Sequence, residues 1–411
     1  MTQSPAPGEL EEFDVGRATW ATRFVFAANG GLFATWVSRI PAVRDDIGAT
    51  ERGLGFALLF VAVGSLAAMP LSGRLVTRVG VRRVLITCIV TCALGYTAVG
   101  LAPDLVVISA VLLVLGAGVG VWDVAMNVSA HAVEVRAGRT LMPGFHAAWS
   151  IGTVVGAGIG ALAAKAGVEP AVQFALCAGV VGVAAVVAVR AMPDRPADEP
   201  EEEDHVDASA ERHVPQRGAL IRDPRLLGLG LMTFCAAWAE GAANDWLALM
   251  LTDDRGASGA LAALGFAVFA GAMTLGRVVG NQVVAWLGRV RSLRTGAVVA
   301  AVGVTGMLAI DSLPVAYAGA ALWGLGISIG FPLAMSAAGE TPGRGASAIA
   351  TVATIAYAGF LVGPPLLGSA AHATSLDSAL WTVVLLTAGI FALAGNARSP
   401  RRGVRSAAVR G

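Results

Sequence analysis

Apolar segments that are long enough to cross a lipid bilayer recur along almost the whole chain, and they limit the possible folds more than any other feature. A transmembrane helix needs about 20 predominantly apolar residues. The 411 residues are 56% hydrophobic and only 14% charged, whereas a soluble domain carries about 25% charged residues. Such a small polar surface cannot shield the apolar side chains from water. We therefore predict an all-α membrane protein that uses lipid as its solvent.

Hydropathy predicts twelve transmembrane helices in two groups of six. The first group occupies residues 20–190 and the second residues 225–396. A polar, acidic linker over residues 191–224 separates the groups, and tails at 1–19 and 397–411 are expected at the two ends. The spans are expected at about residues 20–40, 54–76, 84–101, 105–130, 141–164, 168–189, 226–251, 261–287, 295–310, 313–338, 347–371 and 380–394.

The two groups of six resemble each other, which indicates an internal duplication. Residues 34–36 correspond to residues 244–246, and the Gly-x-Gly of residues 116–118 corresponds to that of residues 324–326. Parallel repeats of this kind form two bundles related by an axis along the membrane normal, with a binding site between them. We therefore predict two pseudo-symmetric six-helix bundles around a central site.

Arginines gather in the loops on one side of the predicted bundles, which sets the orientation. If both termini are cytoplasmic, the inner loops, the linker and the C-terminal tail hold most of the basic residues. The outer loops then hold only Arg39, Arg44, Arg52, Lys165 and Arg255. The positive-inside rule thus predicts a multi-pass protein of the cytoplasmic (inner) membrane with both termini in the cytoplasm. The acidic N-terminal segment lacks the basic region of a signal peptide, so we expect the first apolar segment to be retained.

The span at residues 226–251 contains two carboxylates and an amide, namely Glu240, Asp245 and Asn244. An Asp at the centre of a membrane helix costs roughly 2.5–3.5 kcal/mol on insertion scales, so such groups usually face a water-filled cavity or a polar partner. Glu240 and Asn244 are four residues apart and share one helix face. These residues and the adjacent Trp246 are therefore expected to line a polar cavity.

Two further spans carry polar side chains. Asp123 and Asn127 share a face of the span at 105–130, and His146 lies near the start of the next span. Asp123 is interpreted either as a carboxylate that binds protons or cargo, or as one member of a structural ion pair. His146 is interpreted either as a proton relay or cargo donor, or as a structural histidine.

Aromatic residues inside the spans also have two interpretations. Rings in a polar cavity can stack on a sugar or a cation, but buried rings usually pack and rings near helix ends usually anchor at the interface. The expected proton-coupling residues are Asp123 and Glu240. The expected cargo-binding residues are Asn29, Trp36, Asn127, His146, Glu240, Asn244, Asp245, Trp246, Trp323 and Tyr357.

The loop at residues 73–83 resembles the signature loop of the major facilitator superfamily, Gly-x-Leu-x-Asp-Arg-x-Gly-Arg-Arg. Its glycines permit a tight turn, and its arginines can reach helix ends and carboxylates. The predicted gating residues are Gly73, Arg74, Arg78, Gly80, Arg82 and Arg83. Thr77 stands where the pattern has Asp, which puts a latch built on that Asp in doubt. The alternative is a plain positive-inside loop. The equivalent loop of the second half, residues 276–289, is more degenerate.

Four longer segments are similar to the YbjJ/MosC group of major facilitators. They are residues 36–45, 239–247, 322–333 and 360–368, and the resemblance extends over nearly all of residues 20–395. It implies an inner-membrane transporter that is distantly related to fucose permease-type sugar:proton symporters. That wider group has a carboxylate in its fourth helix, as Asp123 is here. The connection to MosC points to an amino-inositol by association.

The sequence therefore predicts a monomeric secondary transporter that moves a small polar solute by alternating access, coupled to protons. The solute is expected to be a sugar, a polyol or an amino-sugar. The alternatives are sodium coupling, export of drugs or metabolites by the same fold, and a membrane sensor that binds a partner without moving solute.

Other classes of function are disfavoured by the sequence. It shows no nucleophile–base–acid set, no phosphate-binding Gly-x4-Gly-Lys loop and no basic cluster for nucleic acid, so we predict no enzyme activity, no cofactor and no nucleic-acid partner. Cys88 and Cys92 are one helical turn apart, but no His accompanies them, so we interpret them as small buried apolar residues rather than metal ligands.

Overall fold

The computed structural model describes residues 14–138, 141–194, 223–341 and 345–398, and all regular secondary structure in these ranges is helical. The first half contains α1 (Val15–Val37), α2 (Ile40–Asp46), α3 (Glu51–Val79), α4 (Val81–Gly100), α5 (Leu105–Ala137), α6 (Met142–Lys165) and α7 (Pro170–Val189). The second half contains α9 (Pro224–Asp253), α10 (Gly259–Leu287), α11 (Arg289–Ala309), α12 (Leu313–Ile327), α13 (Gly330–Gly339), α14 (Gly345–Ala373), α15 (Leu376–Leu393) and the short η1 (Ala394–Ala397). Most of the predicted linker and most of each predicted tail lie outside the described residues.

Within the described residues, 11 helices are long and apolar enough to cross a membrane, with α12 and α13 together forming one of them. The predicted first span, α1, is not among the 11 and carries Arg17 and Arg23 in its first half. It nevertheless packs along α6 and α7 as a full member of the first bundle. Within the predicted span at 313–338, Ser328 and Ile329 separate α12 from α13, directly before the Gly330-Phe331-Pro332 sequence.

Local sequence signals explain where the helices begin and turn. Asp104 and Asp223 cap α5 and α9 by accepting hydrogen bonds from the first backbone N–H groups of these helices. Gly80, with φ 93°, joins α3 to α4, and Gly288, with φ 76°, joins α10 to α11. Positive φ favours glycine. The two glycines occupy equivalent places in the two halves, as a duplicated chain requires.

Helix packing repeats between the halves in the same way. α1 packs on α6 as α9 packs on α14, and α3 packs on α5 as α10 packs on α12. A Cβ atom on Gly116 of α5 would collide with the carbonyl oxygen of Val61, and one on Gly324 of α12 would collide with that of Phe269. Both glycines allow close backbone contact between helices. The structure therefore confirms two pseudo-symmetric helical bundles.

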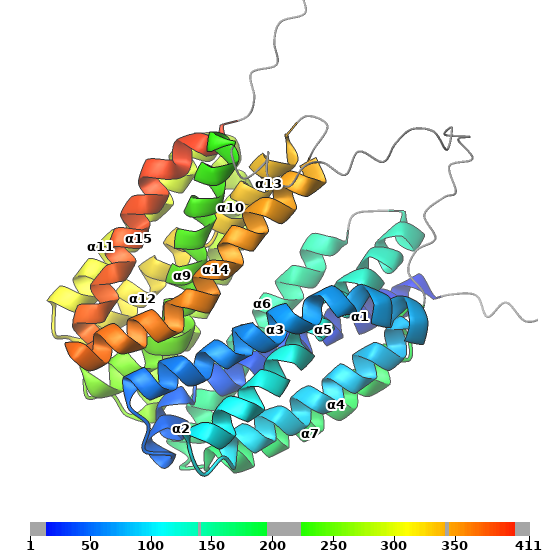
Figure 1. Cartoon of the computed structure of the whole chain (residues 1–411), viewed down its shortest axis with the longest axis horizontal. Helices are drawn as coiled ribbons and strands as arrows, with labels where there is room; N and C mark the ends of the chain where they lie inside the picture. Colours follow the sequence, from blue (N-terminus) through cyan, green and yellow to red (C-terminus); the bar gives the residue numbers. More distant parts are fainter. Residues whose placement is uncertain (1–13, 139–140, 195–222, 342–344, 399–411) are drawn as a thin grey trace, which may run out of the picture.

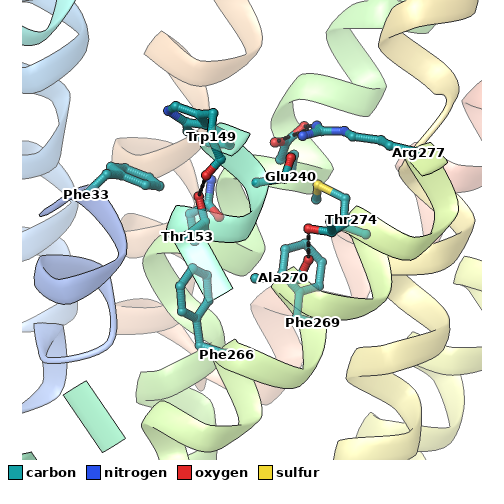
Figure 2. Close-up of a pocket in the computed structure, with 12 residues that line it drawn as sticks. Phe33, Trp149, Thr153, Glu240, Phe266, Phe269, Ala270, Thr274 and Arg277 are labelled. Atoms are coloured by element: carbon teal, nitrogen blue, oxygen red, sulfur yellow. Dashed lines mark hydrogen bonds and ion pairs between the residues drawn. The ribbon is translucent and has the colours of Figure 1, made fainter. Parts of the chain in front are cut away.

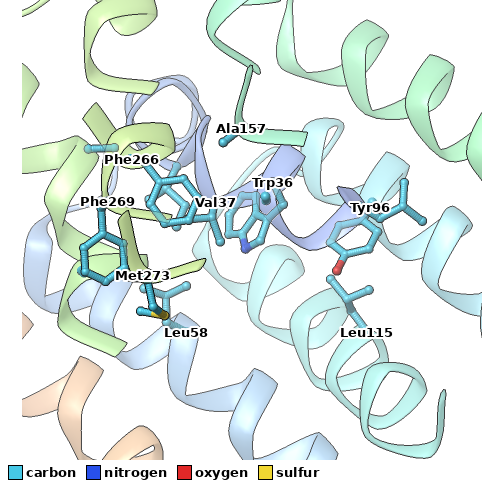
Figure 3. Packing of buried hydrophobic residues seen from close by; sticks show 14 of the residues in the cluster. Trp36, Val37, Leu58, Tyr96, Leu115, Ala157, Phe266, Phe269 and Met273 are labelled. Carbon is cyan, nitrogen blue, oxygen red and sulfur yellow. The ribbon is translucent and has the colours of Figure 1, made fainter. Parts of the chain in front are cut away.

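The two bundles approach each other at the end that carries α2, which we call the α2 end, and diverge toward the opposite end (Figure 1). α6 packs on α10 and α3 on α14 across this interface. One continuous cluster of buried apolar side chains crosses it and includes Val37 and Leu58 of the first bundle and Phe266 and Met273 of the second (Figure 3). A second cluster, around Leu229 and Leu293, contains only residues of the second bundle.

Candidate functional site

A pocket lies between the two bundles, with walls from α1, α6, α9 and α10 (Figure 2). It encloses about 320 Å³, part of which is open to solvent. Its lining residues are Phe33, Trp149, Ser150, Thr153, Glu240, Asn244, Phe266, Phe269, Ala270, Met273, Thr274 and Arg277. Of the residues that the sequence predicted to bind cargo, the structure brings Glu240 and Asn244 into this pocket.

An ion pair forms the polar side of the pocket. Both carboxylate oxygens of Glu240 accept from one terminal nitrogen of Arg277, at 3.2 and 3.4 Å. The two side chains are 21% and 30% exposed, so the pair is partly shielded from water and reaches the pocket. Sequence reasoning missed Arg277 because it placed this residue in the degenerate second gating loop. The structure corrects this, since Arg277 lies inside α10, ten residues before its end.

Aromatic rings form another wall, on the side of the first bundle. Phe33 and Trp149 are stacked with ring centroids 6.2 Å apart. The indole N–H of Trp149 donates to the side-chain oxygen of Asn29 at 3.0 Å. Asn29 itself is 8% exposed and does not line the pocket. It was expected to touch cargo, but in this structure it orients Trp149.

A second polar group lies on α5. The amide of Asn127 donates to the backbone oxygen of Asp123 at 2.8 Å and to its carboxylate at 3.3 Å. No cation of the described residues forms an ion pair with Asp123. The structure thus pairs Asp123 with Asn127, and neither these two residues nor Tyr357 of α14 lines the pocket.

Two other predicted polar residues also stand outside the pocket lining. His146 packs edge-on against Phe26, with ring centroids 5.4 Å apart. Asp245 is half-buried on α9 and forms no hydrogen bond or ion pair with any residue in the described ranges. His146 therefore contacts an aromatic ring of its own bundle, whereas Asp245 is a separate carboxylate inside the protein.

The three predicted indole contacts lie in packed regions instead. Trp36 is 4% exposed and packs against Phe174, whereas Trp246 and Trp323 are fully buried. The ring of Trp323 packs edge-on behind the pocket residue Phe269. In this conformation the three tryptophans support helix packing and do not line the pocket.

The predicted gating loop is a tight turn that is tied to its own bundle. The backbone N–H of Arg82 donates to Asp194 at 2.9 Å, and its guanidinium donates to the carbonyl oxygen of Met192 at 2.7 Å. The hydroxyl of Thr77 donates to backbone oxygens of α3, including that of Gly73 at 3.0 Å. Thr77 therefore does not replace the latch of the missing Asp. The side chains of Arg74, Arg78 and Arg83 are exposed, and their gating role stays a prediction.

A cluster of charged side chains joins the bundles at the α2 end. The guanidinium of Arg44 binds Asp253 at the end of α9, and it lies 2.7 Å from Asp45 and 3.9 Å from Glu51. Glu51 also lies 3.8 Å from His372 at the end of α14. Burial opposes the charge of Arg44, but the hydrogen bonds that its guanidinium donates to Asp253 and Asp45 raise its pKa above the usual value. We call these five residues the α2-end charge cluster.

Within the described residues, no group of three or more His, Cys, Asp or Glu side chains is placed to hold a metal ion. Cys88 and Cys92 are buried thiols on α4. Polar side chains inside the bundles are found at the Glu240–Arg277 pocket, at the Asp123–Asn127 pair and at Asp245.

Comparison with known proteins agrees with this architecture. The chain is 34% identical over 385 residues to an uncharacterized MFS-type transporter of Yersinia pestis, with 93% of this chain and 95% of that protein covered. It is 28% identical over 371 residues to the membrane protein MosC of Rhizobium meliloti, with 89% and 86% covered. Among solved structures, it is similar to the nucleoside transporter NupG, with a TM-score of 0.72, 12% identity, and 92% and 98% of the two chains covered.

At 12% identity the likeness to NupG concerns the fold. The relatives match over nearly their whole lengths and are named as a transporter and a membrane protein, and the arrangement of two bundles around a central pocket fits them. This likeness speaks for a transporter and against an enzyme. The family model described as Major Facilitator Superfamily matches residues 19–364, and the chain therefore belongs to this superfamily of membrane transporters.

Proposed function

We propose that the protein is a secondary transporter that moves a small polar solute, of the sugar, polyol or amino-sugar kind, by alternating access. The observation that carries the proposal is the pocket of about 320 Å³, which takes its walls from both bundles and contains the Glu240–Arg277 pair. Rocking of one bundle against the other opens such a site first to one side of the membrane and then to the other.

The proposed orientation places both termini in the cytoplasm of a cell bounded by an inner membrane. It is supported by the arginines at the end opposite α2, among them Arg74, Arg78 and Arg291. The α2 end then faces outward. Because the bundles meet at the α2 end and diverge at the other (Figure 1), the structure corresponds to a carrier that is closed to the outside and faces the cytoplasm.

Coupling to protons is proposed to use Asp123. Its carboxylate accepts one hydrogen bond from Asn127 and has no cationic partner among the described residues. The charge of Glu240, the other candidate, is already balanced by Arg277 at 3.2 Å. Burying an unpaired carboxylate favours its neutral form, so binding a proton lets Asp123 remain inside the bundle while the carrier changes conformation.

Filling the pocket should stop transport. We expect Thr274→Trp to reduce solute counterflow at least a hundredfold, because Thr274 lines the pocket and an indole occupies much of its volume. The measurement is exchange of labelled solutes across liposomes that contain the purified full-length protein, with D-glucose, myo-inositol, D-glucosamine and uridine offered in turn.

The matched control is Leu275→Trp, which places the same ring one residue further along α10, where the side chain is 57% exposed. This variant should exchange solute like the unmodified protein. Equal counterflow by both variants would exclude the pocket as the transport site. Binding of a solute without exchange would instead identify a sensor.

A further inference from the structure

We infer that the pocket selects an uncharged ring with several hydroxyl groups, and that it rejects the amino and carboxylate analogues of the same ring. The inference narrows the solute class of the proposed function and rests on it, since the pocket is taken as the cargo site. Three features of the pocket carry it: its charge balance, its free hydrogen-bonding groups and its aromatic wall.

The charges of the pocket cancel. Glu240 and Arg277 are the two charged residues among the lining residues, and they lie in direct contact at 3.2 Å. An ammonium group placed beside Glu240 would also approach Arg277, and a carboxylate placed beside Arg277 would approach Glu240. Attraction and repulsion at similar distances offset each other, while the charged solute still loses its hydration on entry. A neutral solute avoids this cost.

Several hydrogen-bonding groups of the pocket are already in use. The hydroxyl of Thr153 donates to the backbone oxygen of Trp149 at 3.1 Å, and that of Thr274 donates to the backbone oxygen of Ala270 at 2.8 Å (Figure 2). Each hydroxyl therefore offers the cargo only its lone pairs. The indole N–H of Trp149 is also used, because it donates to Asn29.

Other groups of the pocket can still donate. Arg277 keeps N–H groups beyond the one nitrogen that contacts Glu240, Asn244 has an amide that can donate or accept, and Ser150 has a hydroxyl that can do both. A hydroxyl group donates to one neighbour and accepts from another, so vicinal hydroxyls can satisfy the Thr oxygens, Glu240 and Arg277 together. Ether and ketone oxygens can only accept, so they offer no hydrogen to the Thr oxygens or to Glu240.

The aromatic wall points to a ring. Phe33 and Trp149 present stacked, half-buried aromatic faces on the side of the first bundle, and Phe266 and Phe269 of α10, each 1% exposed, line the pocket from the second bundle. The apolar face of a polyol ring can lie against such a wall while its hydroxyls point toward Glu240 and Arg277.

The test measures binding of the full-length protein in lipid nanodiscs by calorimetry at pH 6, where the amine of glucosamine and the carboxylate of glucuronate are both charged. D-Glucose, D-glucosamine and D-glucuronate form one matched series, and myo-inositol and uridine represent cyclic polyols and the ribose diol of a nucleoside. We expect at least one of the three neutral probes to bind, and glucosamine and glucuronate to bind at least tenfold more weakly than that probe. Binding of a charged probe as tight as that of the best neutral probe overturns the inference, as does binding of none of the neutral probes.

Charge-changing variants test the cause of this preference. Glu240→Gln leaves Arg277 unbalanced and should shift the ratio of glucuronate to neutral-probe affinity at least tenfold upward. Arg277→Gln leaves Glu240 unbalanced and should raise the ratio of glucosamine to neutral-probe affinity by a similar factor. The double variant is balanced again and should return to the neutral preference, provided that its melting temperature shows a folded protein.

The outcomes separate the inference from the proposed function. If the unmodified protein exchanges solute and Thr274→Trp stops it, but the charge preference does not follow the variants, the Glu240–Arg277 pair is not the selector and the inference fails alone. If no probe and no other small solute is exchanged by the unmodified protein, the proposed function fails.

Discussion

Asp123→Asn should abolish solute accumulation driven by a pH gradient while leaving solute exchange intact. The amide copies the shape of the protonated acid and can keep the contact with Asn127, but it cannot release a proton. A gradient of one pH unit is worth about 1.4 kcal/mol and can support at most about tenfold accumulation per coupled proton. Without this coupling, the variant should bring the solute concentrations inside and outside the liposomes to a ratio of about one.

The measurement compares uptake into liposomes under an imposed pH gradient with counterflow at equal pH. Asp104→Asn is the matched control, because it makes the same change on the same helix at a capping position where Asn serves as well as Asp. Accumulation by Asp123→Asn at the unmodified level would remove Asp123 from the coupling step. If Asp245→Asn then lost accumulation instead, the half-buried carboxylate of α9 would be the carrier of the proton.

Gly55→Leu should prevent closure of the α2 end and shift the protein toward an outward-open state. A Cβ atom on Gly55 of α3 would lie 2.5 Å from the carbonyl oxygen of Pro364 and 3.3 Å from the Cα of Gly368, both on α14. The backbone cannot move aside as a flexible side chain can. Overpacking of this kind costs typically 1–3 kcal/mol, which corresponds to a shift in the conformational equilibrium of roughly five- to 150-fold.

Distances between spin labels can detect this shift. Labels at Glu169 and Ala373 report on the α2 end, and labels at Arg78 and Arg291 report on the opposite end; all four side chains are exposed. In Gly55→Leu the first distance should lengthen and the second should shorten. The control is Gly179→Leu on α7, where a Cβ atom meets nothing within 4 Å. Unchanged distances in Gly55→Leu would mean that the contact of α3 with α14 does not hold the α2 end closed.

Much of the fold could be predicted from the sequence because two strong signals agree. Each apolar segment is long enough to be recognised as a span by itself, and correspondences such as that of Gly116 with Gly324 identify the duplication. Both glycines do meet a neighbouring helix at equivalent places. One predicted span, α1, is not among the 11 clearly apolar helices, and it carries two arginines near its start.

The site could be predicted only in part, because membrane helices are apolar on nearly all sides. Lipid and protein interior are both apolar, so the pattern of apolar residues does not show which face of a helix points inward. Glu240 and Asn244 were found because a carboxylate and an amide inside a span share a face. The same reasoning could not place Trp246, which follows Asn244 by two residues and turns into the core.

Arg277 shows a second limit of sequence reasoning. It is a lone cation within the long apolar segment at 261–287, and this alone marks it as a functional candidate. Matching it to the signature loop of the other half hid that signal. The contribution of Asn29 could not be foreseen either, because its bond to Trp149 joins α1 to α6 and depends on how these helices pack.

The apolar cluster shared by both bundles at the α2 end has a consequence for the unloaded carrier. Opening that end would wet Leu58, Phe266 and Met273, which are at most 6% exposed when it is closed. Wetting apolar area is unfavourable in proportion to the area, so this cluster favours the unloaded protein with its α2 end closed. A solute that must enter from the α2 end, which is the outer end in the proposed orientation, then finds only the minor fraction of molecules that are open to it, and its apparent affinity is lowered by that fraction.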